Sequence, residues 1–161
     1  MEPITVSIRQ FTSHNIEALN SFFKSIVETG LDTWFHPHPF DIKQASLLCN
    51  NKGSDWSAAA FIKNPSGSDQ IVGYSILRGW DEGYDSPSFG VCVLPPWQNK
   101  QIGRRLTLAA IEAAKLRKSP AMRLKVYPQN HKAISLYKSL GFKFGNSTEE
   151  GQKVGWLYLT D

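Results

Sequence analysis

Hydrophobic residues recur along this chain with two different periods, and each period predicts one kind of secondary structure. Apolar and polar residues alternate at positions 4–11, a pattern typical of a half-buried strand. Apolar residues at positions 15–29 stand three and four residues apart, which indicates an amphipathic helix that ends at Gly30. On this basis we expect strands at 4–11, 56–63, 71–77, 88–94, 122–126, 142–144 and 154–159, and helices at 15–29, 41–49, 103–118 and 130–140.

The order of these elements predicts the class of fold. One strand is followed by two helices and three strands, and the rest of the chain is a helix, a strand, a helix and a closing hairpin. This order favours a mixed α/β (α+β) sheet with helices on its faces. We find no internal repeat, linker or break in composition, so residues 1–161 are expected to form a single domain.

The composition excludes several classes of protein. Hydrophobic residues make up 41% and charged residues 20% of the chain, which is typical of a globular domain and not of a disordered or fibrous one. No apolar run is long enough to cross a membrane, and residues 1–3 do not resemble the start of a secretory signal. Cys49 and Cys92 are the only cysteines, which argues against a disulfide framework. We therefore expect a cytoplasmic protein that does not act at a membrane.

The chain is basic, with a formal net charge of +4 at pH 7. Several basic residues bracket the helix expected at 103–118, and the densest group comprises Lys100, Arg104, Arg105, Lys115, Arg117 and Lys118. A compact ligand with several phosphates suits this distribution as well as a nucleic-acid backbone does. A basic nucleic-acid-binding domain is therefore an alternative, but we expect no nucleic-acid partner, because the remaining basic residues are spread along the chain.

A strand, a proline pair and a short polar loop lead into the most regular helix of the chain. Residues 91–106 read Val-Cys-Val-Leu-Pro-Pro-Trp-Gln-Asn-Lys-Gln-Ile-Gly-Arg-Arg-Leu. The first amides of a helix have no partner within the helix and carry a partial positive charge, so phosphate is their natural ligand. Gly103 lets an anion approach the backbone, and Lys100, Arg104 and Arg105 add cationic donors. The segment predicts a phosphate-binding turn, although it lacks the spacing of a Walker or a Rossmann loop.

This segment resembles the acetyl-CoA pyrophosphate loop of the GNAT family of N-acetyltransferases, which reads Arg/Gln-x-x-Gly-x-Gly/Ala after a strand that ends in Val-x-Pro. The six residues from Gln98 read Gln-Asn-Lys-Gln-Ile-Gly. Residues 130–142 read Asn-His-Lys-Ala-Ile-Ser-Leu-Tyr-Lys-Ser-Leu-Gly-Phe and are similar to the family's Asn-x-x-Ala-x-x-x-Tyr-x-x-x-Gly-Phe. One position departs from the pattern, because Gln101 stands where the family has its first glycine. If the backbone there needs a positive φ, Gln101 is strained and CoA binding is weakened.

The resemblance implies a fold, a reaction and a set of site residues. The fold is a central, mostly antiparallel twisted sheet flanked by helices, with a splayed pair of strands near Val93 and Val126 that holds acetyl-CoA as the acyl donor. The reaction is direct transfer of the acetyl group to a primary amine. The Val93 amide would stabilise the oxyanion, and Tyr137 would protonate the leaving thiolate. The residues expected to contact CoA are Val91, Cys92, Val93, Gln98, Asn99, Lys100, Gln101, Ile102, Gly103, Arg104, Asn130, Ala133 and Tyr137.

The acceptor side has weaker signals. Four residues of one aromatic and histidine-containing loop are expected to bind the acceptor: Trp34, Phe35, His36 and His38. The expected general base is Asp85, and the other candidates are Asp81, Glu82, His36 and His38. No metal site is expected, because the two histidines have no cysteine or carboxylate at a matching spacing. Packing alone also explains Tyr137 and the aromatic loop, and helix capping alone explains Asn130.

Three functions are consistent with these observations. We expect an N-acetyltransferase whose acceptor is a small-molecule amine, such as an amino sugar. A protein N-terminus or a lysine side chain is the alternative acceptor. A non-catalytic acyl-CoA-binding or sensing module is a further alternative, supported by Gln101 and by the lack of an obvious base. Homodimers are common in the family, but no residue here establishes one.

Overall fold

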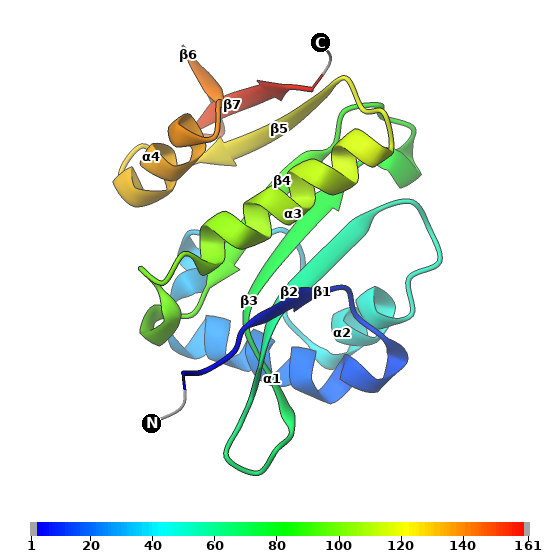
Figure 1. The fold of residues 1–161 in the computed structure, drawn as a ribbon. Helices are drawn as coiled ribbons and strands as arrows, with labels where there is room; N and C mark the ends of the chain where they lie inside the picture. The colour runs from blue at the N-terminus through cyan, green and yellow to red at the C-terminus, as the bar shows by residue number, and fades with distance from the viewer. Residues whose placement is uncertain (1–2, 160–161) are drawn as a thin grey trace.

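The computed structural model describes residues 3–159, which form one seven-stranded sheet with helices on both of its faces (Figure 1). The strands are β1 (Ser7–Arg9), β2 (Trp56–Lys63), β3 (Asp69–Arg78), β4 (Ser88–Val93), β5 (Ala121–Val126), β6 (Lys143–Glu149) and β7 (Gln152–Tyr158). The α-helices are α1 (Ile16–Glu28), α2 (Ile42–Cys49), α3 (Ile102–Leu116) and α4 (His131–Ser139). Short 3₁₀ helices are η1 (Ser13–Asn15), η2 (Leu31–Thr33), η3 (Trp80–Glu82) and η4 (Pro95–Trp97).

The strands follow the order β1-β2-β3-β4-β5-β7-β6 across the sheet. Neighbouring strands are antiparallel except for β4 and β5, which are parallel. The crossover between these two strands is α3, as a parallel connection requires. The expected mixed, mostly antiparallel sheet is confirmed.

Different helices bury the two faces of the sheet. On β4, Phe89 packs into a core cluster with residues of α3 and α4, whereas Cys92 packs with residues of α1 and α2. Side chains alternate between the faces of a strand, so β4 contributes to both layers. Phe23 of α1 and Leu106 of α3 are fully buried on their respective faces. Figure 1 shows α3 running across the sheet and α1 and α2 lying on the other side.

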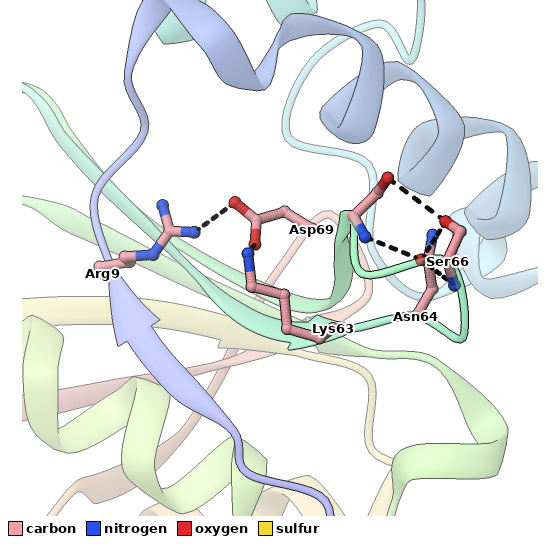
Figure 2. Close-up of polar contacts among 6 residues, drawn as sticks. Arg9, Lys63, Asn64, Ser66 and Asp69 are labelled. Atoms are coloured by element: carbon pink, nitrogen blue, oxygen red, sulfur yellow. Dashed lines mark hydrogen bonds and ion pairs between the residues drawn. The ribbon is translucent and has the colours of Figure 1, made fainter.

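Polar contacts fix the turn between β2 and β3 and attach the edge strand β1 to it (Figure 2). The Asn64 side chain accepts a hydrogen bond from the Ser66 amide at 3.0 Å. Asp69 lies 2.7 Å from Arg9 Nη2 and 2.8 Å from Lys63 Nζ. The hydrogen bond from Lys63, together with that from Arg9, holds the pKa of Asp69 below its ordinary value. These contacts connect the first and third strands through one carboxylate.

The first strand is shorter than its sequence pattern predicts. Only Ser7–Arg9 pairs with β2, whereas alternation predicts a strand over 4–11. The carbonyl of Val6 instead accepts a hydrogen bond from Arg105 Nη2 of α3 at 3.0 Å. Strand β1 therefore begins directly after the residue whose carbonyl is bound by this side chain of α3.

The closing hairpin has a longer first strand than expected. The sequence predicts a strand at 142–144, and β6 extends to Glu149. The added residues are polar and mostly exposed, and the register shifts between Phe144 and Thr148. An exposed edge strand has no buried face, so no alternating apolar pattern marks it.

Candidate active site

A cleft opens where the parallel strands β4 and β5 separate. The two strands pair only at Ser88 with Arg123 and at Phe89 with Leu124. Beyond these pairs they diverge and leave a cleft of about 570 Å³, which is lined by β4, the end of β5, α4 and the loop that enters α3. The splayed strand pair expected near Val93 is therefore present.

The β4 backbone presents hydrogen-bonding groups to this cleft. Antiparallel strands alternate between residues that exchange hydrogen bonds with their partner and residues that do not. The Leu94 amide donates to the Val72 carbonyl at 2.9 Å, and the continuous register then places Cys92 in the next hydrogen-bonded pair. The amides and carbonyls of Val91 and Val93 consequently face away from β3. They point into the space that β5 has left, where an extended ligand finds the open edge of a strand.

The loop before α3 has two residues in the left-handed region of backbone conformation. Asn99 has φ +62° and Gln101 has φ +67°. Asparagine tolerates this conformation, but glutamine does so at a cost, because its Cβ crowds the backbone. The positive φ that the motif requires at position 101 is thus present without the glycine. Gln98 secures the loop, since its Nε2 donates to the carbonyl of Val93 at 2.9 Å.

The first turn of α3 faces the cleft. Gly103 lies in this turn, and a Cβ added there would come no closer than 3.7 Å to Leu136 and 3.8 Å to Val93, which are ordinary contacts. Packing within the protein therefore does not require glycine here. Arg104 and Lys132 line the cleft beside the loop, and Lys132 Nζ donates to Asn99 Oδ1 at 3.3 Å. The helix dipole and these two cations together make this end of the cleft suited to an anion.

Two residues of the second motif line the opposite wall. Asn130 caps α4, because its Oδ1 accepts a hydrogen bond from the Ala133 amide at 3.4 Å. Tyr137 lies one helical turn beyond Ala133 and packs edge-on against Phe89, with ring centroids 6.2 Å apart. Both Asn130 and Tyr137 also line the cleft, so capping and packing are compatible with ligand contact.

The Tyr137 hydroxyl is chemically suited to donate a proton. Only 6% of the residue is exposed, and burial raises the pKa of Tyr137 well above its ordinary value. The nearby Cys92 acts in the same direction. Within residues 3–159 the hydroxyl has no protein hydrogen-bond partner, and it stays protonated at neutral pH. Its proton is therefore available to a ligand in the cleft.

The loop between α1 and α2 forms the remaining wall and reaches across the split in the sheet. A Cβ on Gly90 would lie 3.0 Å from Phe35, so the absent side chain at this position makes room for the aromatic ring. Trp34 packs edge-on against Tyr127, with ring centroids 5.5 Å apart, and His36 Nε2 lies 3.1 Å from the Tyr127 hydroxyl. Because Tyr127 directly follows β5, these contacts join the two halves of the sheet.

His38 lies in the same loop but is turned inward. Its Nδ1 donates to the Pro39 carbonyl at 2.8 Å, and its Nε2 lies 3.0 Å from the hydroxyl of Tyr74, which is fully buried. Burial lowers the pKa of His38, and the positive charge of Arg78 lowers it further, whereas the Pro39 carbonyl opposes the shift. His38 is therefore a neutral structural residue that anchors the loop to β3.

A family model described as the acetyltransferase (GNAT) family matches residues 19–142. The chain belongs to the GNAT family. This confirms the family that the two motifs predict, and the expected enzyme class and acetyl-CoA donor agree with it.

Two curated proteins named mycothiol acetyltransferase are similar to this GNAT chain in sequence. The protein from Renibacterium salmoninarum is 27% identical over 148 residues, which are 87% of this chain and 41% of that protein. The protein from Thermobifida fusca is 34% identical over 94 residues, which are 54% of this chain and 29% of that protein. The chain therefore spans less than half the length of these relatives.

Solved structures share the fold over nearly the whole chain. An N-acetyltransferase from Kribbella flavida matches with a TM-score of 0.75, 20% identity and coverage of 96% of this chain and 98% of its own. The GNAT domain of PAT from S. lividans has a TM-score of 0.76, 15% identity and coverage of 99% and 100%. A putative acetyltransferase, yncA, from Salmonella typhimurium, solved with its cofactor acetyl-CoA, has a TM-score of 0.74, 20% identity and coverage of 97% and 95%.

The structure of this GNAT protein brings most of the expected site residues together. The expected CoA-contacting residues line the cleft with one exception, since Lys100 points into a separate groove beside Arg105. Of the acceptor loop, Trp34 and Phe35 line the cleft, but His36 and His38 do not. Asp85 is exposed in the loop before β4, at the end of that strand remote from the cleft, and it is not part of the lining either. The alternative base Asp81 accepts hydrogen bonds from the amides of residues 54 and 55, a structural role.

The sequence motifs did not predict several of the residues that line the cleft. Lys132 and Leu136 lie on α4 next to Ala133 and Tyr137, and Gln129 lies two residues before the helix begins, so the three-and-four spacing of Gln129, Lys132 and Leu136 was an available signal. Gly90 and Lys125 had no such signal, because their position depends on how β4 and β5 pair.

Neither a metal nor a membrane is indicated by the described residues. Residues 3–159 contain no group of three or more His, Cys, Asp or Glu side chains that would hold a metal ion. Among the helices in this range, none has the length and apolar character of a transmembrane segment. The cleft lining within the same range includes no Asp, Glu or His.

Proposed function

We propose that this GNAT protein transfers the acetyl group of acetyl-CoA to the primary amine of a small molecule. The observation that carries the proposal is the cleft between β4 and β5, which has an anion-binding helix terminus at one end and a protonated tyrosine on its wall. The family match and the relatives named mycothiol acetyltransferase support acetyl transfer.

The donor would lie along the exposed edge of β4. The amides at the start of α3, with Arg104 and Lys132, would hold the pyrophosphate. The amides of Val91 and Val93 and the carbonyl of Val91, which face away from β3, would pair with the pantetheine arm, whereas the Val93 carbonyl already accepts a hydrogen bond from Gln98. Asn130 would contact the same arm from the opposite wall. This arrangement orders the donor by backbone contacts, which depend little on side-chain identity.

The reaction would use two groups of this chain. The amine nitrogen attacks the thioester carbon, and the Val93 amide stabilises the oxyanion of the tetrahedral intermediate. When the carbon–sulfur bond breaks, the Tyr137 hydroxyl gives its proton to the CoA thiolate. The proton that the amine loses passes to water, because no acidic or histidine side chain of the described residues lines the cleft. The absence of such a base favours a substrate amine that is already neutral when it reacts.

Turnover assays test this proposal. The chain is incubated with acetyl-CoA and a panel of small amines, including amino sugars and amino acids, and released CoA thiol is measured. Acetyl-CoA-dependent thiol release that requires an amine is the expected result. Binding of acetyl-CoA without turnover on any amine, or acetylation of peptide N-termini or lysines alone, would contradict it.

A further inference from the structure

The face of the sheet that α1 and α2 cover is open over its second half. Those helices share a core cluster with residues of β2, β3 and β4, and in the described residues no member of that cluster comes from β5, β6 or β7. In Figure 1, α1 and α2 lie at the side of the molecule away from these three strands. The open half of the face borders the acceptor side of the cleft, where Phe35 rests on Gly90.

A cross-strand row that contains two arginines crosses this open face. Arg78 is in register with Ser88, Ser88 with Arg123, and Arg123 with Trp156, so these side chains lie on one face of four adjacent strands. Their sequence neighbours Leu77, Phe89 and Leu124 pack into the core beneath α3, which places the row on the opposite, open face. The Arg123 guanidinium lies over the Trp156 ring, 5.9 Å from its centroid.

Lys125 continues this row into the cleft. It lies two residues beyond Arg123 on the same face of β5, about 6.6 Å further along the strand. Its side chain is 28% exposed and it is one of the residues that line the cleft, together with Tyr137. Lys125 is therefore the cation on this face that shares the cleft with the proposed reaction centre.

Positive charge exceeds negative charge on this face. Two carboxylates approach the row, and both come from the tip of the β6–β7 hairpin. Glu149 pairs closely with Arg123 and lies 3.9 Å from Lys125 Nζ, and Glu150 lies 3.6 Å from Lys125 Nζ. Arg78 donates to the Pro37 carbonyl and has no carboxylate within ion-pair distance among residues 3–159. The contacts of Lys125 are near the upper limit of an ion pair, so a better-placed anion can replace them.

We propose that the acceptor is a small amine that also carries an anionic group, a carboxylate or a phosphate, and that Lys125 binds this group. The inference rests on the proposed acetyl transfer and deepens it by naming the substrate class. Lys125 holds the anion at the mouth of the cleft and leaves the amine to reach the thioester. The anion takes the position near Lys125 that the hairpin carboxylates occupy in the free protein. A small acceptor is favoured over a polypeptide, because the contacts of Trp34 and His36 with Tyr127 join the two walls beside this site.

Matched acceptors and two opposing variants test the inference. The acceptors are pairs with and without the anion, such as an amino acid and its amide, and an amino sugar phosphate and the free amino sugar, and rates are compared at equal concentrations of the neutral amine. The wild-type chain is expected to prefer the anionic member in kcat/KM by about tenfold or more, the size of one charge-assisted hydrogen bond. Lys125→Gln should abolish most of this preference by raising KM. Glu149→Gln should lower KM for the anionic acceptor, because it removes a competing carboxylate.

The controls separate this inference from the proposed function. Lys138→Gln removes an exposed charge on α4 outside the cleft and should leave the preference unchanged. Equal turnover of charged and neutral acceptors, or a Lys125→Gln variant that keeps the preference, overturns the inference and leaves acetyl transfer intact. Turnover of acidic peptides without turnover of small anionic amines also overturns it. No acetyl-CoA-dependent turnover of any acceptor contradicts the proposed function itself, and with it this inference. Of the two anionic acceptors, the amino acid and the amino sugar phosphate, the one with the higher kcat/KM shows whether the preferred anion is a carboxylate or a phosphate.

Discussion

Gln101 shows how a single residue sets the quality of the donor site. Its φ of +67° lies in a region where a side chain costs about 1–2 kcal/mol, and the sequence motif alone predicts that glycine belongs there. The loop nevertheless keeps the required backbone conformation. The strain is therefore borne by the folded protein before any ligand binds, and we expect Gln101 to weaken donor binding through the bulk that it places beside the proposed pyrophosphate position.

Replacing Gln101 with glycine should strengthen acetyl-CoA binding. Gln101→Gly removes both the strain and the side chain, so we expect the Kd for acetyl-CoA to fall several-fold, measured by calorimetry. The stability of the free protein should change little, because glycine adds about 0.5–1 kcal/mol of unfolded-state entropy that offsets the relieved strain. Gln101→Val is the opposing variant and should weaken binding. Identical affinity for the three proteins would show that the loop does not contact the pyrophosphate.

Tyr137 is the proposed proton donor to the CoA thiolate, and a single substitution tests this role. Tyr137→Phe removes the proton donor but keeps the ring that packs against Phe89, so the melting temperature should change little. We expect kcat to fall by about 10²-fold or more, with little change in the KM for acetyl-CoA. Burial raises the pKa of Tyr137, so its ionisation should not reduce activity between pH 7 and 9. A variant with wild-type kcat would assign thiolate protonation to water.

The helices and strands that position the site differ in how well the sequence pattern predicts them. The helix expected at 103–118 is present as Ile102–Leu116, because a long amphipathic period leaves few alternatives. The strand expected at 142–144 is extended to Glu149, because an exposed edge strand carries no alternating pattern. Lys125 was not predicted as a site residue. Its place in the cleft follows from the pairing of β5 with β4, which is a long-range property that no local pattern encodes.

The loop between α1 and α2 is held against the second half of the sheet by one residue. Tyr127 connects this loop to the end of β5 through Trp34 and His36. Tyr127→Ala should release the loop from the second half of the sheet and raise the KM for the amine by several-fold. The Kd for acetyl-CoA should stay the same, since Tyr127 does not line the cleft. Tyr127→Phe keeps the aromatic contact with Trp34 but loses the hydrogen bond to His36. Its KM for the amine should lie between those of the wild-type chain and Tyr127→Ala. A parallel loss of donor affinity would instead indicate a general loss of structure.

The whole molecule should lose stability at both acidic and alkaline pH through identifiable buried groups. Burial lowers the pKa of His38 below 6.5, so the unfolded chain takes up a proton first as pH falls, and stability decreases below about pH 6.5. Burial raises the pKa of Cys92 from 9.0 to about 12 and that of Cys49 to about 11. The unfolded thiols therefore ionise first as pH rises, and stability decreases above about pH 9 by roughly 1 kcal/mol per pH unit for each thiol.

Urea unfolding at a series of pH values measures these effects. His38→Gln should flatten the acidic decline, and Cys92→Ala should make the alkaline decline shallower, even though each variant starts from a lower stability. Only the slope against pH is diagnostic, because the loss of packing shifts the whole curve. Unchanged slopes would assign the pH dependence to other groups.

Binding of acetyl-CoA at the start of α3 is the claim on which the account of this GNAT protein depends. The most direct measurement is a thermal-shift titration with acetyl-CoA, comparing the wild-type chain with Gly103→Asp. An acidic residue suits a helix N-terminus, and a Cβ at position 103 has room, so this variant should fold normally while its charge repels the pyrophosphate. Leu108→Asp, at an exposed position of α3 outside the cleft, carries the same added charge as a control. We predict a saturable rise in melting temperature for the wild-type chain and for Leu108→Asp, and none for Gly103→Asp. No rise for the wild-type chain at millimolar acetyl-CoA, or an equal rise for Gly103→Asp, would contradict the account.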